Sequence, residues 1–322
     1  MKSIGLVGLG NAGRPLAERL LQKGYQPKVY DLNPEAMEAI AKLGALKAAS
    51  AGDATSKVTM MVLPSSTEVR AAVFDEQGIL AGLQPGSILL DLSGTDPECA
   101  RELEQKIEER DAHFLGATLH AAGAPSVTIP KGLLSIVVGG KKEPLEACLG
   151  ILKDLAQKVV CVREPWMPKV MKIAVIMFAA TSSILSAEVF AWLLSQRIDP
   201  RLFLELLKTT GSRESAERVE AFLRRNRSYG GALSNSYKDI HQALEVAANQ
   251  HFPLPLMSLV NQIQEMGRAQ GLTRTNTPAA MGKLYEILTG IDLSHAVLDG
   301  ERTFPEPHEP QVVYLEELVK KL

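Results

Sequence analysis

Three closely spaced glycines near the start of the chain constrain its fold most. Residues 5–13 read Gly-Leu-Val-Gly-Leu-Gly-Asn-Ala-Gly, and they join an apolar run to a helix-like run. In such a turn the first glycine permits a tight bend, the second leaves room for a pyrophosphate, and the third lets helix and strand pack closely, while the helix amino terminus attracts the anion. The spacing predicts a dinucleotide-binding turn made by Gly8, Leu9, Gly10, Asn11, Ala12 and Gly13.

An acidic residue follows the glycines at the distance that a nucleotide ribose requires. A second strand-like run, 28–30, ends at Asp31, about 20 residues beyond the turn. A carboxylate there accepts hydrogen bonds from the adenosine ribose hydroxyls and repels a 2′-phosphate, so Asp31 favours NAD over NADP. Asp31 could instead cap the helix that follows, but Asn33, with Pro34 at the first helical position, fills that role better.

Strand-like and helix-like runs alternate through the first half of the chain. The strands are nearly continuous apolar runs, so we expect an α/β fold with a Rossmann-type, doubly wound parallel sheet that helices cover on both faces. The predicted strands after the glycine turn are 28–30, 58–63, 87–92, 113–119, 134–138 and 159–162, and the predicted helices are 14–22, 66–74, 97–110 and 143–156. Loops at the carboxyl ends of strands face the cofactor in such a sheet, so Leu63, Pro64 and Ser65 join the predicted cofactor site.

After Pro165 the pattern changes to helix-period segments. A helix from Pro168 to about Arg197, about 45 Å long, would join the two domains. Further helices are predicted over 200–209, 214–225, 236–249, 255–270 and 278–289. We therefore expect a dinucleotide-binding domain over 1–164, an all-helical domain for substrate binding and oligomerisation over 165–298, and a tail over 299–322 that ends in an amphipathic helix, 311–322.

Composition argues against several classes of partner. A formal charge of −2 provides no field that gathers polyanions, so we expect no nucleic-acid partner. The three cysteines lack metal-ligand spacing, which fits reduced thiols in a cytosol, and no metal site is expected. Met1 and Lys2 lead into the first strand without a signal peptide, so we expect a cytoplasmic protein. Lys172 and Glu188 interrupt the most apolar run, which favours a buried helix over a membrane span.

Four motifs carry a resemblance to one family. Gly8–Ala17 is similar to the opening signature of that family, and Asp91–Pro97, Asp-Leu-Ser-Gly-Thr-Asp-Pro, is similar to its substrate-carboxylate motif. Lys172 precedes Glu188 by sixteen residues, as in the family's catalytic helix, and Lys238–Ile240 lies where the family has a late Lys-Asp-Leu motif. Over about residues 3–297 the chain thus resembles the β-hydroxyacid dehydrogenases, which include 3-hydroxyisobutyrate dehydrogenase, tartronate semialdehyde reductase and, more distantly, 6-phosphogluconate dehydrogenase.

The resemblance implies that Lys172 is the catalytic residue. Oxidising an alcohol with a nicotinamide cofactor requires one group to remove the hydroxyl proton while hydride leaves the same carbon. Because burial and a neighbouring positive charge both oppose the ammonium form, a lysine beside the oxidised nicotinamide can act as general base near neutral pH and as general acid in the reverse direction. The alternative for Lys172 is an exposed lysine in the first turn of a helix, paired with a nearby acid.

The resemblance also implies a site for the substrate carboxylate. Ser93, Gly94 and Thr95 lie between a strand and the helix that Pro97 opens, so their N–H groups and hydroxyls can converge on an anion. The alternative is a plain helix cap made by Thr95 or Asp96.

Two residues of the second half complete the implied site. Lys238 would place positive charge near the substrate or the nicotinamide, and the alternative is a solvated lysine. Ser212 belongs to a Gly-Ser pair that aligns with a pair near the substrate in the family.

The chain departs from the family pattern at several positions. Ala12 replaces a methionine, and Val175 and Ile176 stand where the family places an asparagine that holds the reacting oxygen. The family loop Asp-Ala-Pro-Val-Ser-Gly-Gly has become Gly-Ala-Thr-Leu-His-Ala-Ala-Gly, followed by a short insertion, so we expect Gly123 near the cleft. His120 would replace the serine of that loop as a donor, unless it is structural. Since an oriented donor stabilises a transition state, its loss predicts poor activity on the usual substrates of the family. From these departures together we infer a bulkier, less polar substrate.

These expectations converge on an NAD-dependent oxidoreductase that interconverts a small β-hydroxy acid and its aldehyde or ketone. The first alternative is an imine reductase, which shares this architecture and lacks the usual polar pair, although such enzymes resemble a version with aspartate or tyrosine in place of Lys172. The second is a binding protein that kept the dinucleotide pocket without catalysis. Helical faces rich in Leu, Ile, Met and Ala predict a homodimer or homotetramer.

Overall fold

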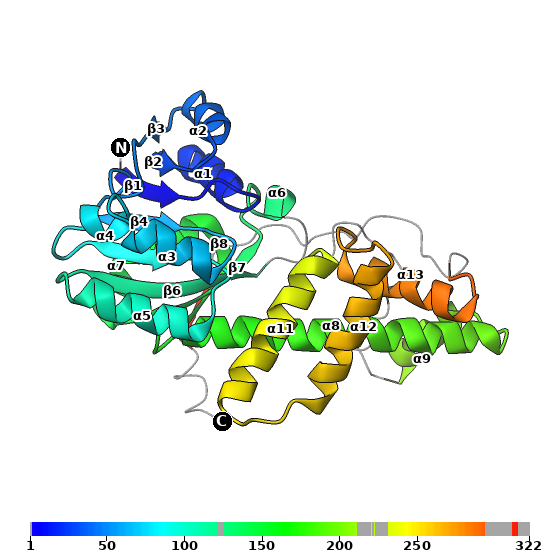
Figure 1. Ribbon diagram of the computed structural model, residues 1–322. Helices are drawn as coiled ribbons and strands as arrows, with labels where there is room; N and C mark the ends of the chain where they lie inside the picture. The colour runs from blue at the N-terminus through cyan, green and yellow to red at the C-terminus, as the bar shows by residue number, and fades with distance from the viewer. Residues whose placement is uncertain are drawn as a thin grey trace. The chain divides into compact units, whose positions relative to one another are not determined.

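The protein divides into two compact units. The computed structural model describes residues 2–120, 125–210, 220, 222, 231–293 and 311–314 (Figure 1). One unit comprises Met1–Lys172 together with Glu306–Leu322, and the other comprises Ile173–Pro305. The first unit contains the sheet, and the second is built from helices.

A nine-stranded sheet organises the first unit, with the order β3-β2-β1-β4-β5-β6-β7-β8-β9. Neighbouring strands run parallel except β6 and β7, so the predicted doubly wound, mainly parallel α/β fold is confirmed. The strands are β1 (Lys2–Val7), β2 (Tyr25–Tyr30), β3 (Leu46–Lys47), β4 (Val58–Met61), β5 (Ile88–Asp91), β6 (His113–His120), β7 (Leu134–Gly140), β8 (Ala156–Val162) and β9 (Gln311–Tyr314).

Helices cover both faces of this sheet and enclose two separate apolar cores. On one face lie α1 (Gly13–Gln22), α2 (Pro34–Ala41) and α7 (Lys142–Leu155), and the side chains that they bury include Leu16, Ile40 and Leu152. On the other face lie α3 (Ser66–Phe74), α4 (Ile79–Gly82) and α5 (Pro97–Glu108) (Figure 1). Burial on both faces explains why the strands read as nearly continuous apolar runs.

The end of the chain corrects one prediction. Residues 311–314 form β9, which pairs in parallel with β8, so the amphipathic helix predicted over 311–322 is wrong for these four residues. The side chains of Val312 and Tyr314 pack against the core beneath the sheet. The sequence Gln-Val-Val-Tyr is rich in β-branched and aromatic residues, which suit a strand that lies on an apolar surface.

Helices are the regular elements of the described part of the second unit, apart from one isolated bridge between Ala232 and Asn276. Its helices are most of α8 (Met167–Ser195), and α9 (Pro200–Thr209), α11 (Leu233–Asn249), α12 (Pro255–Ala269) and α13 (Thr277–Thr289). They bury an apolar core that includes Phe190, Ile240 and Met281. The predicted long helix and the helix over 200–209 are thus present, whereas the helix predicted over 214–225 falls outside the described residues except at 220 and 222.

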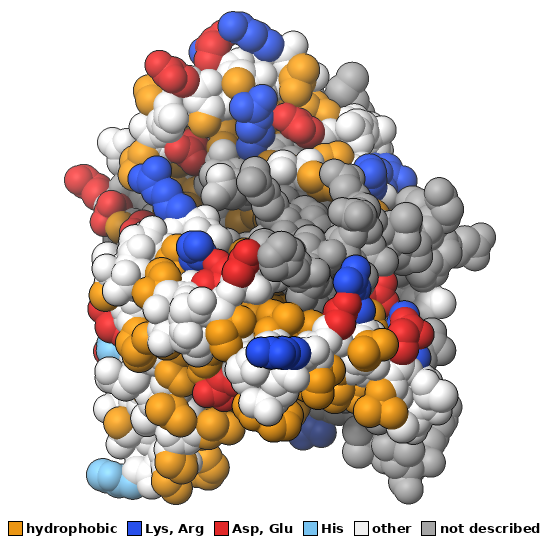
Figure 2. All heavy atoms as spheres, turned by 90° about the vertical axis from the view of Figure 1, so that its right-hand side faces the viewer, with side chains coloured by type: hydrophobic (Ala, Val, Ile, Leu, Met, Phe, Trp, Pro, Cys, Tyr) orange, Lys and Arg blue, Asp and Glu red, His pale blue; other side chains and the backbone are white. Residues whose placement is uncertain are grey.

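The second unit also exposes many apolar side chains. Phe178 and Trp192 on α8 are 70% and 63% exposed, and Leu206 on α9 and Leu259 on α12 each expose more than half of their surface. Hydrophobic side chains are frequent on the surface seen in Figure 2. The homodimer or homotetramer expected from such faces stays a prediction.

Among the described helices, α8 alone is long and apolar enough to cross a membrane, judged by its length and composition. Within its most apolar window, 28% of the residues are buried. Buried helices of water-soluble proteins meet the same two criteria, so the expected absence of a membrane partner stays a prediction.

Candidate functional site

The glycine turn after β1 has the geometry that its sequence predicts. Gly8 has a φ of +95°, a conformation that side chains disfavour, and a Cβ there would collide with the carbonyl oxygen of Val62. A Cβ at Gly13 would collide with the carbonyl oxygen of Gly8, so close packing of α1 on the turn requires glycine. A Cβ at Gly10 would meet nothing within 4 Å. The first and third glycines therefore shape the turn, and the second leaves open space beside it.

This turn fits the pyrophosphate of a dinucleotide. The N-cap residue of α1, Ala12, makes no side-chain cap, and the first turn of the helix contains no acidic residue. Its amino-terminal N–H groups and the positive end of its dipole therefore remain suited to an anion. Asn11 is exposed and Leu9 is buried, with 4% of its surface accessible.

Asp31, at the end of β2, lies beside the glycine turn. Its Oδ2 accepts a hydrogen bond of 2.6 Å from the N–H of Leu9, and its Oδ1 accepts one of 2.8 Å from the N–H of Asn33. The side chain of Asn33 caps α2 by accepting a bond from the N–H of Glu35, so Asp31 is not the helix cap. Asp31 thus lies at the end of β2 and contacts the glycine turn, and its role in binding ribose stays a prediction.

The loop after β4 lies between the glycine turn and the loop after β5. The N–H of Leu63 donates a hydrogen bond of 2.9 Å to the hydroxyl of Ser93. Ser65 caps α3 by accepting a bond from the N–H of Thr67 at 3.2 Å, and its hydroxyl also contacts Glu68. The predicted cofactor loop Leu63–Ser65, which includes Pro64, is therefore coupled through Leu63 to the predicted substrate loop.

The predicted substrate loop is held by a buried carboxylate. Asp91 is fully buried at the end of β5, and its Oδ1 accepts a hydrogen bond of 2.9 Å from the N–H of Ser93. The hydroxyl of Thr95 lies 3.3 Å from Asp91 Oδ2. Ser93 and Thr95 are themselves 1% and 4% exposed, so both hydroxyls bond within the protein. Among the described residues, no acceptor pairs with the N–H of Gly94 or of Thr95, and these two donors suit an anion.

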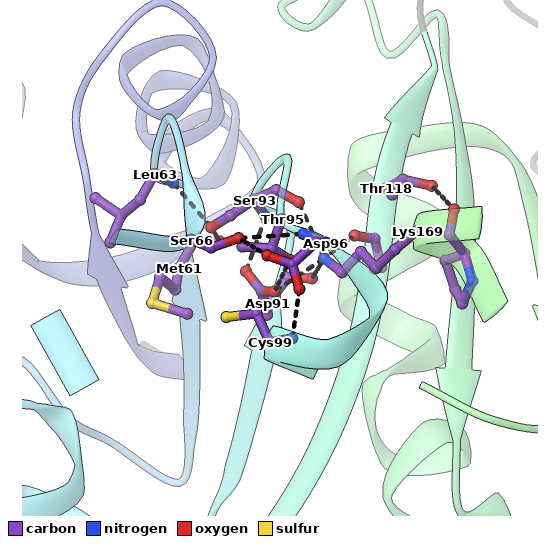
Figure 3. Close-up of polar contacts among 12 residues, drawn as sticks. Met61, Leu63, Ser66, Asp91, Ser93, Thr95, Asp96, Cys99, Thr118 and Lys169 are labelled. Carbon is purple, nitrogen blue, oxygen red and sulfur yellow. Dashed lines mark hydrogen bonds and ion pairs between the residues drawn. The ribbon is translucent and has the colours of Figure 1, made fainter. Parts of the chain in front are cut away.

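The structure settles which residue caps α5. Asp96 Oδ1 accepts a hydrogen bond of 2.7 Å from the N–H of Cys99, and Asp96 Oδ2 accepts one from the hydroxyl of Ser66 (Figure 3). The cap is therefore Asp96 and not Thr95.

Sequence reasoning missed Lys169, the buried partner of Asp91. Its Nζ lies 2.8 Å from Asp91 Oδ2 and 2.9 Å from the carbonyl oxygens of both Ser93 and Ala117. Figure 3 shows the side chain reaching from α8 to the loop after β5. The available signal was Asp91 itself, because a carboxylate at the end of a fully buried strand requires a partner.

Lys172 and His120 lie close enough to interact electrostatically. Burial lowers the pKa of His120 below its ordinary value, and the positive charge of Lys172 lowers it further. His120 Nε2 lies 3.0 Å from the hydroxyl of Thr118, which contacts the carbonyl oxygen of Pro168 at 3.4 Å. Lys172 is half-buried. The neutral form of His120 is favoured here, so this residue suits a hydrogen-bonding role better than that of a fixed positive charge.

The other predicted substrate residues are placed as follows. Ile176 lies on α8 and Lys238 on α11, both in the second unit, where the Lys238 ammonium lies 3.4 Å from the carboxylate of Asp239. Gly123 and Ser212 fall outside the described residues. The roles of these four residues stay predictions.

Comparison with known proteins gives two family matches. Residues 3–163 match the model described as the NAD binding domain of 6-phosphogluconate dehydrogenase. Residues 168–285 match the model described as NAD-binding of NADP-dependent 3-hydroxyisobutyrate dehydrogenase. Together the two matches span strands β1 to β8, apart from Lys2, and most of the helical unit, whereas β9 lies outside both.

Individual proteins agree with these matches. The mitochondrial 3-hydroxyisobutyrate dehydrogenase of Mus musculus is 26% identical over 299 residues, which cover 88% of this chain and 87% of that protein. The NAD-dependent L-serine dehydrogenase of Pseudomonas aeruginosa is 27% identical over 301 residues, which cover 90% of this chain and 100% of that protein. A solved structure of Mycobacterium tuberculosis 3-hydroxyisobutyrate dehydrogenase with L-serine shares the fold at a TM-score of 0.80 and 22% identity. The match covers 88% of this chain and 99% of that chain.

Proposed function

Since this chain belongs to the β-hydroxyacid dehydrogenase family and has an NAD(P)-binding domain, we propose that it oxidises a small β-hydroxy acid, or reduces the corresponding aldehyde or ketone, with Lys172 as general base and acid. The observation that carries this proposal is the alignment of the predicted site along one edge of the sheet. Gly8, Leu63, Ser93 and His120 lie at the carboxyl ends of β1, β4, β5 and β6, which are consecutive neighbours in the sheet. Ligands bind at this edge in open α/β sheets.

The residues divide the chemistry between them. The Gly94 and Thr95 N–H groups would hold the substrate carboxylate, which orients the hydroxyl-bearing carbon. A bound nicotinamide dinucleotide supplies the hydride acceptor in oxidation and the hydride donor in reduction. Lys172 would take the hydroxyl proton during oxidation and return it during reduction. His120, largely neutral, would donate or accept a hydrogen bond at the reacting oxygen, where Val175 and Ile176 provide none.

We propose NAD as the preferred cofactor. The carboxylate of Asp31 lies at the end of β2 beside the glycine turn, where it would bind ribose hydroxyls and repel a 2′-phosphate. The P. aeruginosa relative is NAD-dependent, whereas one matching family model describes an NADP-dependent enzyme, so both cofactors enter the test.

We also propose that the substrate is bulkier and less polar than 3-hydroxyisobutyrate or L-serine. Val175 and Ile176 offer methyl groups where the family pattern has an amide. A hydrogen-bonding substrate group placed against such side chains would lose its partner on binding, which costs free energy.

A panel of substrates tests this proposal. Purified protein is mixed with NAD or NADP and with 3-hydroxyisobutyrate, L-serine and β-hydroxy acids that carry larger apolar substituents, and reduced cofactor is followed by absorbance. We expect turnover with NAD, fastest on the larger apolar acids. Absence of turnover on every acid, with measurable cofactor binding, would leave a dinucleotide-binding protein without this activity.

A second candidate function is imine reduction. The apolar pair Val175 and Ile176 favours it, because an imine carbon needs no amide to hold a reacting oxygen, whereas Lys172 argues against it. Cyclic imines with NADH or NADPH therefore belong in the same panel. Turnover of imines together with inert hydroxy acids would select this alternative.

A further inference from the structure

A charged lysine is buried at the start of α8, outside the residues that the proposed chemistry uses. Lys169 is 1% exposed, and the side chains of Lys169 and Asp91 are both fully shielded from solvent. Removing two charges from water costs free energy that their mutual attraction often fails to recover, so apolar residues of similar size would serve stability at least as well. The pair therefore calls for an explanation other than stability.

The pair holds Ser93 by both of its peptide groups. The N–H of Ser93 donates to Asp91 Oδ1 at 2.9 Å, and the carbonyl oxygen of Ser93 accepts from Lys169 Nζ at the same distance. The Thr95 hydroxyl adds a contact to Asp91 Oδ2 (Figure 3). These bonds fix the backbone on both sides of Gly94, and thus the directions of the Gly94 and Thr95 N–H groups.

The same ammonium fixes the first turn of α8 to two strands. Lys169 Nζ also binds the carbonyl oxygen of Ala117 on β6, and the carbonyl oxygen of Pro168 lies 3.4 Å from the Thr118 hydroxyl. Lys172 follows Lys169 by three residues, about one helical turn. Contacts that hold Lys169 against β5 and β6 thereby set where the Lys172 side chain starts.

We propose that Lys169 is a positioning residue, whose bonds to Asp91, Ser93 and Ala117 set the placement of Lys172 relative to the N–H groups of Gly94 and Thr95. This inference rests on the proposed function, because it explains how the general base and the carboxylate site are held in register. A catalytic group displaced by about 1 Å can lose about 100-fold in rate.

The experiment separates placement from folding. Lys169→Met alone leaves the Asp91 carboxylate buried without its counter-charge, so we pair it with the double variant Lys169→Met/Asp91→Asn, which has no buried charge left unpaired. Ile107→Ala is the matched control. Ile107 is fully buried on α5, the helix that follows the loop after β5. It lies ten residues beyond Pro97, which is about 15 Å along the helix, so its replacement disturbs the core away from the loop. Thermal midpoints, cofactor Kd by fluorescence, kcat and the KM of the hydroxy acid are measured for each protein.

We expect Lys169→Met to lower the thermal midpoint, and the double variant to have a midpoint close to that of the unsubstituted protein. The cofactor Kd of the double variant should lie within about twofold of the unsubstituted value. Its kcat should fall by about 100-fold and the KM of the hydroxy acid should rise by about tenfold, whereas Ile107→Ala should lower the midpoint and leave both constants within about twofold. A folded double variant with unchanged kcat and KM would overturn the positioning role alone. Absence of turnover in the unsubstituted protein would overturn the proposed function, and the positioning role with it.

Discussion

The carboxylate of Asp31 accepts a 2.6 Å hydrogen bond from the N–H of Leu9, so the end of β2 is joined to the middle of the glycine turn. Leu9 stands between Gly8, which makes the bend, and Gly10, which leaves the open space. A single side chain thus contacts the turn proposed to bind pyrophosphate and also occupies the position proposed to bind ribose.

Asp31→Asn should therefore weaken NAD binding and relax discrimination against NADP. Removing the charge loses a charge-assisted hydrogen bond, worth about 1.5–3 kcal/mol, so we expect the KM for NAD to rise by about 10- to 150-fold while the KM for NADP falls or stays constant. Glu38→Gln, which removes an exposed carboxylate of α2 that pairs with Lys47, is the control. An unchanged ratio of the KM for NAD to the KM for NADP would show that Asp31 does not distinguish the two cofactors at the ribose.

Lys172→Ala should remove most of the turnover with little effect on cofactor affinity. General acid–base groups contribute about 10²- to 10⁴-fold to rate, so kcat should fall within that range while the cofactor Kd, measured by fluorescence titration, stays within about twofold. Lys106→Ala, which removes an exposed lysine paired with Glu109, should leave kcat unchanged. An unchanged kcat in Lys172→Ala would remove this residue from the mechanism.

His120 should make the folded protein less stable in mild acid. Burial and the charge of Lys172 lower its pKa in the folded state, whereas the unfolded chain has a value of about 6.5. The unfolded state therefore binds more protons as pH falls from about 6.5 toward the folded-state pKa, so the stability contributed by neutral His120 is present above pH 6.5 and lost below it. Urea unfolding of His120→Gln should show a shallower loss of stability over this range than the unsubstituted protein.

His113→Gln is the matched control for the acid effect. His113 lies at the opposite end of the same strand, β6, so its replacement tests the loss of a histidine away from Lys172. Equal pH dependence in the two variants would contradict an origin at His120.

The three cysteines should be unreactive while the protein is folded. Burial raises the pKa of Cys99 and Cys148 to about 12 and that of Cys161 to about 11, so few thiolates exist near neutral pH. A thiol reagent at pH 8 should label none of them in the native protein and all of them after denaturation. The same shifts lower stability as pH rises above about 8.5, because the unfolded thiols release protons first. Rapid labelling of the native protein would contradict the buried positions.

A chain that ends at Pro310 should be less stable than one that ends at Tyr314. The shorter chain lacks β9, loses the ladder with β8 and exposes the surface that Val312 and Tyr314 cover. Burying an aliphatic side chain contributes about 1.5–3 kcal/mol, and Val312 is partly buried, so we expect a loss of about 2 kcal/mol in urea unfolding. Equal stability of the two truncated chains would show that β9 adds nothing to the sheet.

Local sequence signals predicted the parts of the fold that depend on short-range chemistry. The glycine turn, the Asn33 cap and the apolar strands each follow from neighbouring residues, and each is present. The strand β9 could not be found this way, because residues 311–314 become a strand by pairing with β8, about 150 residues earlier in the chain.

The site shows the same division. Asp31 and the loop after β5 follow from motif spacing, whereas the bond between Lys169 and Asp91 joins residues 78 positions apart and depends on how α8 approaches the sheet. The sequence placed the hydroxyls of Ser93 and Thr95 in the carboxylate site, and the structure instead commits them to Leu63 and Asp91. Such internal bonding depends on which loops meet at the sheet edge, which no local pattern encodes.

Because β9 follows the helical unit in the sequence while its partner β8 precedes it, the two strands of this ladder are synthesised far apart in time. A nascent chain that has completed β8 has an unpaired strand edge throughout synthesis of residues 173–305. Chains stalled or cleaved before residue 311 would retain that open edge and be prone to aggregate.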